Sequence, residues 1–163
     1  MPKILKMPSK AELPDGAHRS FVEEMHLHYR EAGRPSLREI ATWIAQANND
    51  EKTEMAGTAS VETVRRVLSG TSIPRRWPTV EAILLAFCGL ADRDPDQPRW
   101  DETHFNAEPV SFRTSLKQKW NEALDDEERL PSLPPRPQPP PPPSQNSDPW
   151  AISKSSFDEE PPF

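Results

Sequence analysis

The residues best suited to bind a ligand lie between positions 60 and 76, where four arginines surround a single acid. Arg65 and Arg66 are adjacent, Arg75 and Arg76 follow ten residues later, and Glu62 is the one carboxylate in the stretch. A guanidinium presents a planar set of N–H donors that fits phosphate oxygens and the edge of guanine. The stretch therefore predicts a local basic patch that can bind nucleic acid.

A second chemically distinctive stretch is the acidic sequence at positions 157–163. It combines three carboxylates, two prolines and a final aromatic ring, namely Asp158, Glu159, Glu160, Pro161, Pro162 and Phe163. A partner with an apolar socket and a basic rim can hold the ring and the Phe163 α-carboxylate together. We therefore expect these six residues to form a docking peptide for another protein. An acidic end that serves only solvation is the alternative.

The other reactive side chains form no recognisable catalytic or metal-binding pattern. The histidines lack metal-ligand spacing, and the five glycines form no phosphate-binding loop. The single cysteine, Cys88, lies among apolar residues and is expected to be a buried small side chain. We therefore expect a protein that is not an enzyme and that has no metal site and no cofactor.

The net charge of −6 is unevenly distributed along the chain. Residues 1–100 contain 14 Lys and Arg against 14 Asp and Glu, whereas residues 101–163 contain 6 against 12. The acidity therefore comes from the C-terminal part and does not argue against nucleic-acid binding by the N-terminal part. Because no stretch approaches 18 apolar residues and no signal-peptide core follows the N-terminus, we expect a cytoplasmic protein without a membrane partner.

Proline content divides the chain into a folded part and a tail. Twelve of the 21 prolines lie at or after Pro131, where the apolar periodicity stops. We expect a polyproline II rod over residues 134–143 within a disordered tail. The expected organisation is a flexible N-terminus with three lysines over 1–12, a helical domain over 13–128, a Pro-rich linker over 129–147 and an acidic partner-docking tail over 148–163.

Five segments of the N-terminal part have the apolar spacing of helices, and none alternates like a strand over a useful length. The second segment opens with a capping box at Ser36 and Glu39, and the fourth is expected to end at Gly89. The predicted fold class is therefore all-α. The expected helices cover residues 20–32, a segment from 37 to about 45, and residues 60–69, 77–88 and 110–128.

The third of these helices carries the first pair of arginines. Ser60 is its expected N-cap and Gly70 the glycine that ends it. Val64, Val67 and Leu68 share one side and are expected to be buried. The other side then presents hydroxyls, a carboxylate and guanidiniums, which is the composition expected of a helix that enters the major groove of DNA: Ser60, Glu62, Thr63, Arg65 and Arg66.

Residues 36–76 resemble the helix-turn-helix of the xenobiotic-response-element and lambda-repressor-like regulators, and residues 63–70 also resemble Lac-repressor-type recognition helices. The stretches 13–16, 29–38 and 74–78 look like an actinobacterial form of the domain, so that the match extends over about residues 13–90. The resemblance implies a bundle of about five helices that binds duplex DNA through the helix at 60–69. It places Ser60, Glu62, Thr63, Arg65 and Arg66 at contact positions. Arg75 and Arg76 follow Gly70 and are candidates for contact with phosphate, with an ordinary surface loop as the alternative.

The last 16 residues resemble the acidic C-terminal tip of bacterial single-stranded DNA-binding proteins. This second resemblance implies partners among the replication, recombination or repair proteins that recognise such tips. Together the two resemblances imply a nucleoid-associated transcriptional regulator or DNA-targeting factor, and they leave a homodimer open. A protein–protein adaptor whose helix-turn-helix does not bind DNA is the alternative function.

Two features depart from the family pattern. The polar stretch 46–58 is expected to be a loop, which is longer and more acidic than the usual turn between the second and third helices. His28 stands where the first helix of the family favours an apolar residue, and we expect it to be half-buried at the edge of the domain. A long acidic turn would change how the recognition helix approaches DNA.

Overall fold

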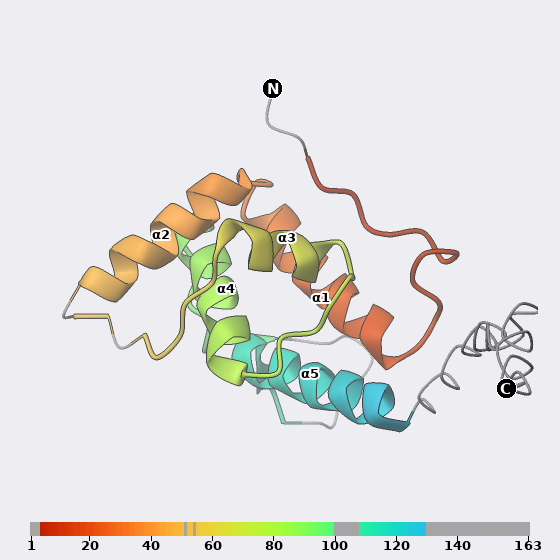
Figure 1. Cartoon of the computed structure of the whole chain (residues 1–163). Helices are drawn as coiled ribbons and strands as arrows, with labels where there is room; N and C mark the ends of the chain where they lie inside the picture. The colour runs from red at the N-terminus through yellow and green to blue at the C-terminus, as the bar shows by residue number, and fades with distance from the viewer. Residues whose placement is uncertain (1–3, 51, 54, 100–107, 130–163) are drawn as a thin grey trace, which may run out of the picture. The chain divides into compact units, whose positions relative to one another are not determined.

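Five α-helices follow one another along the described part of the chain, and the prediction of a mostly helical domain is confirmed there (Figure 1). This computed structural model describes residues 4–50, 52–53, 55–99 and 108–129. None of the described helices has the length and apolar character needed to cross a membrane. The elements are α1 (Ala17–Glu31), α2 (Leu37–Asn49), α3 (Val61–Leu68), α4 (Trp77–Leu90), β1 (Pro98–Arg99), β2 (Val110–Ser111) and α5 (Phe112–Arg129).

The core is built around α1 and α4, each of which packs against three other helices. α1 contacts α3, α4 and α5, whereas α4 contacts α1, α2 and α5, and Figure 1 shows α4 between α2 and α5. The largest completely buried side chains include Phe21 and Met25 of α1 and Ile83 and Phe87 of α4. Burial of this apolar surface is the main force that holds the short helices together, because such helices are marginal in isolation.

The second helix begins as predicted but runs further than expected. Ser36 and Glu39 form the capping box, in which the Glu39 amide donates to Ser36 Oγ at 3.2 Å and the Ser36 amide donates to Glu39 Oε2 at 2.6 Å. The prediction that the loop starts at residue 46 is wrong, since α2 continues to Asn49. The reason is Ala47, which is buried on the same stripe as Ile40 and Ile44.

The fourth helix starts at Trp77 with Pro78 in its first turn, as predicted, but Gly89 does not end it. α4 continues to Leu90, and the indole of Trp43 from α2 packs directly over Gly89. A Cβ at Gly89 would lie 2.2 Å from Trp43 Cζ2. This glycine therefore serves the close packing of two helices rather than the end of one.

The last helix is fastened to the segment that precedes α4. Trp120 is 8% exposed, and its Nε1 donates to the carbonyl oxygen of Pro74 at 2.7 Å. Its ring centroid lies 5.6 Å from that of Trp77. From the sequence, Trp77, Trp100 and Trp120 are expected to pack in the core or between helices rather than to stack on bases; the packing of Trp77 and Trp120 fits this expectation, whereas Trp100 lies outside the described residues. The helix starts at Phe112 rather than at Val110, because Val110 pairs with Arg99 in the short β1–β2 ladder.

The N-terminal segment, expected to be a flexible basic arm, packs against the helices from residue 5 onward. Leu13 is 7% exposed, and Leu5 and Met7 are partly buried against the core. Arg19 of α1 donates from Nη1 to the carbonyl oxygens of Leu13 at 2.7 Å and Pro8 at 3.3 Å. Apolar side chains spaced between the lysines therefore attach this segment to the domain.

Candidate nucleic-acid interface

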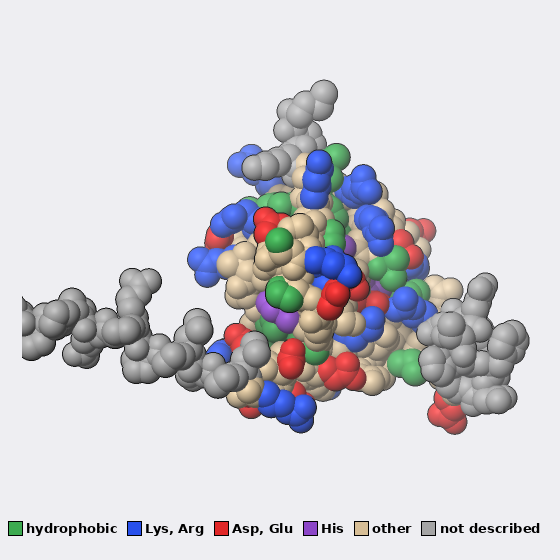
Figure 2. All heavy atoms as spheres, turned by 90° about the vertical axis from the view of Figure 1, so that its right-hand side faces the viewer, with side chains coloured by type: hydrophobic (Ala, Val, Ile, Leu, Met, Phe, Trp, Pro, Cys, Tyr) green, Lys and Arg blue, Asp and Glu red, His purple; other side chains and the backbone are tan. Residues whose placement is uncertain are grey.

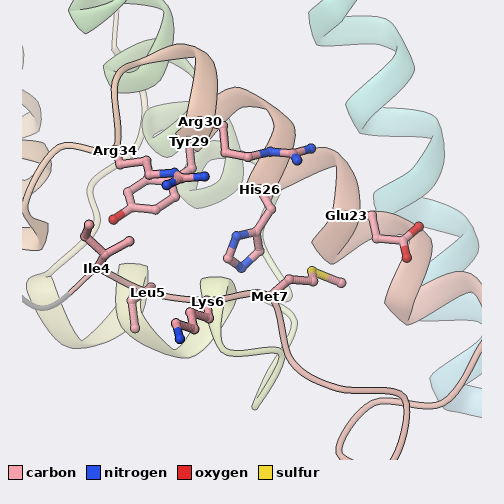
Figure 3. Close-up of a pocket in the computed structure, with 9 residues that line it drawn as sticks. All are labelled: Ile4, Leu5, Lys6, Met7, Glu23, His26, Tyr29, Arg30 and Arg34. Atoms are coloured by element: carbon pink, nitrogen blue, oxygen red, sulfur yellow. The ribbon is translucent and has the colours of Figure 1, made fainter.

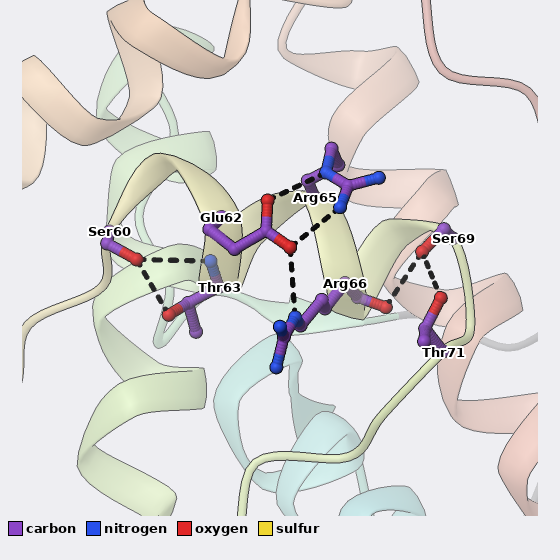
Figure 4. Close-up of polar contacts among 7 residues, drawn as sticks. All are labelled: Ser60, Glu62, Thr63, Arg65, Arg66, Ser69 and Thr71. Carbon is purple, nitrogen blue, oxygen red and sulfur yellow. Dashed lines mark hydrogen bonds and ion pairs between the residues drawn. The ribbon is translucent and has the colours of Figure 1, made fainter.

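The third helix starts at a side-chain cap that ties two of the predicted contact residues together. Ser60 has extended backbone angles, and its Oγ accepts a hydrogen bond from the Thr63 amide at 3.2 Å. The two hydroxyl oxygens, Ser60 Oγ and Thr63 Oγ1, lie 2.9 Å apart (Figure 4). The prediction that Ser60 caps this helix is confirmed.

The charged contact residues of α3 form one ion-pair cluster, which we call the α3 triad: Glu62, Arg65 and Arg66. Arg65 donates from Nη2 to Glu62 Oε1 at 2.6 Å and from Nε to Oε2 at 2.8 Å. Arg66 donates from Nε to Oε1 at 2.9 Å (Figure 4). Spacings of three and four residues put the three side chains on one face of the helix. All three are exposed, so the triad is open to a ligand.

The carboxylate of the triad is fully ionised at neutral pH. Hydrogen bonds from Arg65 and then Arg66 lower the pKa of Glu62 to about 2. The triad therefore carries a net charge of +1, with part of each guanidinium still able to donate. Phosphate would compete with Glu62 for the same N–H groups.

The inner face of α3 is buried, as predicted. Val64, Val67 and Leu68 are 0%, 1% and 0% exposed, whereas Val61 points outward and is 42% exposed. Gly70 follows the helix with a φ of 68°, a left-handed conformation that favours glycine, so its predicted role at the helix end is confirmed. The cap and the terminal glycine thus fix the length of α3.

The second pair of arginines lies beyond the end of α3 and is not joined to the triad. Arg75 and Arg76 are exposed, and within the described part of the chain no hydrogen bond or ion pair links them to other side chains. Arg76 is the residue that precedes α4. The two residues directly before them are anchored, Ile73 by burial of its side chain and Pro74 by the bond from Trp120, and α4 begins directly after them. The backbone that carries them is therefore held in place while their side chains stay free.

The turn that leads into α3 is attached to α2 and α4. The Asn48 side chain donates to the carbonyl oxygen of Gly57 at 3.1 Å. A Cβ at Gly57 would lie 1.9 Å from the carbonyl oxygen of Pro78, so only glycine fits this approach to α4. The turn between α2 and α3 covers residues 50–60 and is shorter than the 46–58 loop plus cap that we predicted. Glu51 and Glu54, two of its acids, lie outside the described residues.

The sequence did not predict a charged cluster around two buried residues of α1, Glu24 and His28, and three partly buried cations, Arg93, Arg99 and Lys119; we call it the α1 network. Glu24 is 3% exposed and forms ion pairs with Arg99 and with Lys119, whose Nζ lies 3.2 Å from Glu24 Oε2. In the sequence, the only local indication of this network is the spacing of four residues between Glu24 and His28. Its other members come from distant segments of the chain.

The expectation that His28 is half-buried is wrong, because its side chain is completely buried. Arg93 Nη2 lies 3.1 Å from His28 Nδ1, and a guanidinium can only donate. Nδ1 is therefore the acceptor, and Nε2 lies 3.5 Å from Glu24 Oε1 without a hydrogen-bond partner in the described part of the chain. The ring of Phe112 packs edge-on against the imidazole, with centroids 5.4 Å apart. Polar partners from α1 and from the segment after α4 allow this histidine to occupy an interior position.

The surface around the N-terminal segment is divided by charge. Figure 2 looks at the side of the molecule on which this segment lies, and shows Lys and Arg side chains most densely over the upper half, with carboxylates among them and in the lower half. Within the described ranges, no group of three or more His, Cys, Asp or Glu side chains is arranged to hold a metal ion. The docking peptide, Asp158 to Phe163, lies outside these ranges.

Comparison of the chain with protein-family models, with curated proteins and with solved structures gives no match.

Proposed function

We propose that this protein is a non-enzymatic helix-turn-helix protein that binds duplex DNA through α3. The observation that carries the proposal is the division of α3 into two faces. Val64, Val67 and Leu68 are buried, while the opposite face offers two hydroxyls and the α3 triad within two helical turns. A helix with this division fits the major groove, where base edges and phosphates are within reach of short polar and guanidinium groups.

The arrangement of α2 and α3 supports a lambda-repressor-like assignment for the domain. The two helices pack against each other, and the turn between them is fastened at Gly57. We propose that α2 and α3 form the helix-turn-helix, with α1, α4 and α5 as its support. In this arrangement α3 is the recognition helix, and the protein acts as a nucleoid-associated transcriptional regulator or DNA-targeting factor.

The two pairs of arginines have different proposed roles. Arg65 and Arg66 lie on the recognition helix, where they can reach base edges or phosphate, with Ser60 and Thr63 beside them. Arg75 and Arg76 lie on an anchored segment just beyond α3, where unpaired guanidiniums suit phosphate. Glu62 holds the first pair in place and can itself accept a hydrogen bond from cytosine.

The direct test is duplex binding after removal of the triad's arginines. A duplex-selection experiment first identifies a binding sequence, and anisotropy then measures affinity over a range of salt concentrations. With three or four phosphate contacts we expect a log–log salt slope of about −3 to −4 for the unmodified protein. Combined Arg65→Ala and Arg66→Ala substitutions should flatten this slope by about two units.

The matched control is Arg129→Ala, which removes an exposed positive charge from the last residue of α5. It should leave both the affinity and the slope unchanged, because it lies far from α3 in the sequence and on a different helix. Unchanged binding by the double variant of α3 would refute the proposal.

A protein–protein adaptor is the second candidate function, and two observations favour it. Glu62 already pairs with both arginines of α3, and Val61 exposes an apolar side chain on the same helix (42%). Both features suit a protein surface as partner. The duplex-selection experiment separates the candidates, because an adaptor would enrich no DNA sequence.

We further propose that the tail recruits proteins that recognise the acidic tips of single-stranded DNA-binding proteins. The composition of the terminal stretch carries this part, with Asp158, Glu159 and Glu160 meeting a basic rim and Phe163 filling an apolar socket after Pro161 and Pro162. A pull-down with the full chain should lose such partners on Phe163→Ala. If the same proteins are captured by both forms, the tip is not the recruiting element.

A further inference from the structure

A groove lies between the N-terminal segment and the C-terminal half of α1. Residues 4–7 form one side of it, and His26, Tyr29, Arg30 and Arg34 form the other (Figure 3). Its volume is about 660 Å³, within the range of sites that hold a short peptide or small ligand. None of the proposed DNA-contact residues lines it.

The wall of the groove is largely apolar and accessible. Ile4 is 52% exposed, which is the largest exposure of any large apolar side chain in the described part of the chain. Leu5 and Met7 are partly buried beside it, and the ring of Tyr29 reaches from α1 toward the segment (Figure 3). A ligand that covers this wall must therefore bring apolar surface of its own.

Cations stand on both rims of the groove. Arg30 and Arg34 lie on the α1 side, and Lys6 projects from the N-terminal segment on the other (Figure 3). Within the described ranges these three side chains form no ion pair and no hydrogen bond. Glu23, the one carboxylate in the lining, pairs with Arg19 at 2.9 Å and points away from the others in Figure 3. The groove therefore has an uncompensated positive charge.

The backbone at Arg34 is strained. Its φ is 57°, and only one other non-glycine residue in the described ranges, Asp92, has a positive φ. Gly33 directly before it has a φ of 80°, and the Arg34 amide donates to the Tyr29 carbonyl at 2.9 Å. A left-handed conformation is unfavourable for a residue with a Cβ and often marks a functional position. Glycine would adopt this backbone conformation without strain. The chain has an arginine instead, and its guanidinium lies at the rim of the groove.

We propose that this groove binds the acidic, aromatic peptide of residues 157–163 supplied by a second copy of the chain. Three carboxylates match the three free cations, and the phenylalanine rings of the peptide match the apolar wall. A nucleic-acid backbone would satisfy the cations but would leave Ile4, Leu5 and Met7 uncovered. The proposal does not depend on duplex binding by α3.

The test uses a fluorescent synthetic peptide with the sequence of residues 157–163. The receptor is the full chain carrying Phe163→Ala, so that its own terminal sequence competes less, and anisotropy measures binding at low salt. We expect saturable binding that combined Arg30→Ala and Arg34→Ala substitutions weaken at least tenfold. Arg38→Ala, which removes an exposed cation of α2 outside the groove, should leave it unchanged.

Two further arms separate the apolar from the charged contribution. Replacing both phenylalanines of the peptide by alanine, or its three acids by amides, should each weaken binding about tenfold. Arg34→Gly removes the guanidinium while relieving the positive φ, and an unchanged melting temperature of this variant shows that a loss of binding does not come from unfolding. Equal affinity for the groove variants and for Arg38→Ala would overturn the proposal, as would a groove that binds duplex DNA but not the peptide.

Discussion

Two carboxylates of the domain, Glu62 and Glu24, have a similarly lowered pKa for different physical reasons. Glu62 in the α3 triad is half exposed, and hydrogen bonds from two arginines of its own helix lower its pKa to about 2. Glu24 in the α1 network is 3% exposed, and its burial would raise the pKa. The favourable interactions with His28, Arg99 and Lys119 outweigh the burial, and the pKa is again lowered to about 2.

The difference in burial means that the α3 triad can exchange its carboxylate for another anion, whereas the α1 network cannot exchange its members. Water reaches Glu62 and its arginines, so phosphate can replace the carboxylate at small cost. Around Glu24, the removal of one partner leaves another charge buried, which is costly. An equal pKa therefore does not mean an equal contribution to stability, and the following substitutions test the distinction.

The largest effect should come from Glu24→Ala. It leaves Arg99 and Lys119, which are 34% and 31% exposed, without their shared carboxylate, and should lower the free energy of unfolding by about 2 kcal/mol. Urea unfolding followed by circular dichroism measures it. The matched variant Glu62→Ala should unfold at the same urea concentration as the unmodified protein, and equal shifts for both variants would refute the comparison.

The second-largest effect should be on the stability of the protein at acid pH. Because the folded-state pKa of Glu24 is lowered from 4.5 to about 2, its contribution to stability is complete above pH 4.5 and is lost as the pH falls toward 2. The melting temperature of the unmodified protein should fall through this window. In Glu24→Gln the fall should be smaller, since the group no longer titrates. Parallel pH profiles for the two proteins would show that other carboxylates control acid unfolding.

The smallest effect should be on the affinity for duplex DNA, with no change in stability. Glu62→Gln removes the negative charge that occupies Arg65 and Arg66, and should raise duplex affinity about fivefold at low salt without changing the melting temperature. Glu122→Gln removes the same charge from an exposed position on α5 and is the control for net charge. An equal gain from both variants would mean that the triad has no special role.

Features set by neighbouring residues could be predicted from the sequence. The capping box at Ser36, the cap at Ser60 and the terminal glycine at position 70 depend on residues three or four positions away, and the structure confirms each. The helical face that holds the predicted contact residues is equally local. The i+3 and i+4 spacing of Glu62 to the arginines also allowed their pairing to be predicted, although we did not do so.

Features set by distant segments could not be predicted. Gly89 looks like a helix end until the ring of Trp43 is known to lie over it. Glu24 meets Arg99 from 75 residues away, and nothing near either residue indicates the pair. The peptide groove needs the N-terminal segment to pack along α1, whereas its lysines alone predict a flexible arm. Tertiary packing decided each of these outcomes.

Chemical modification of the single thiol, Cys88, can be used to measure how readily the domain opens. It is 1% exposed in the middle of the core, and burial raises its pKa, so alkylating reagents should reach it only in molecules that have opened around α4. The rate of its modification under native conditions then reports the free energy of that opening without any denaturant. Because the sequence contains no other cysteine, a single mass shift per chain reads it out.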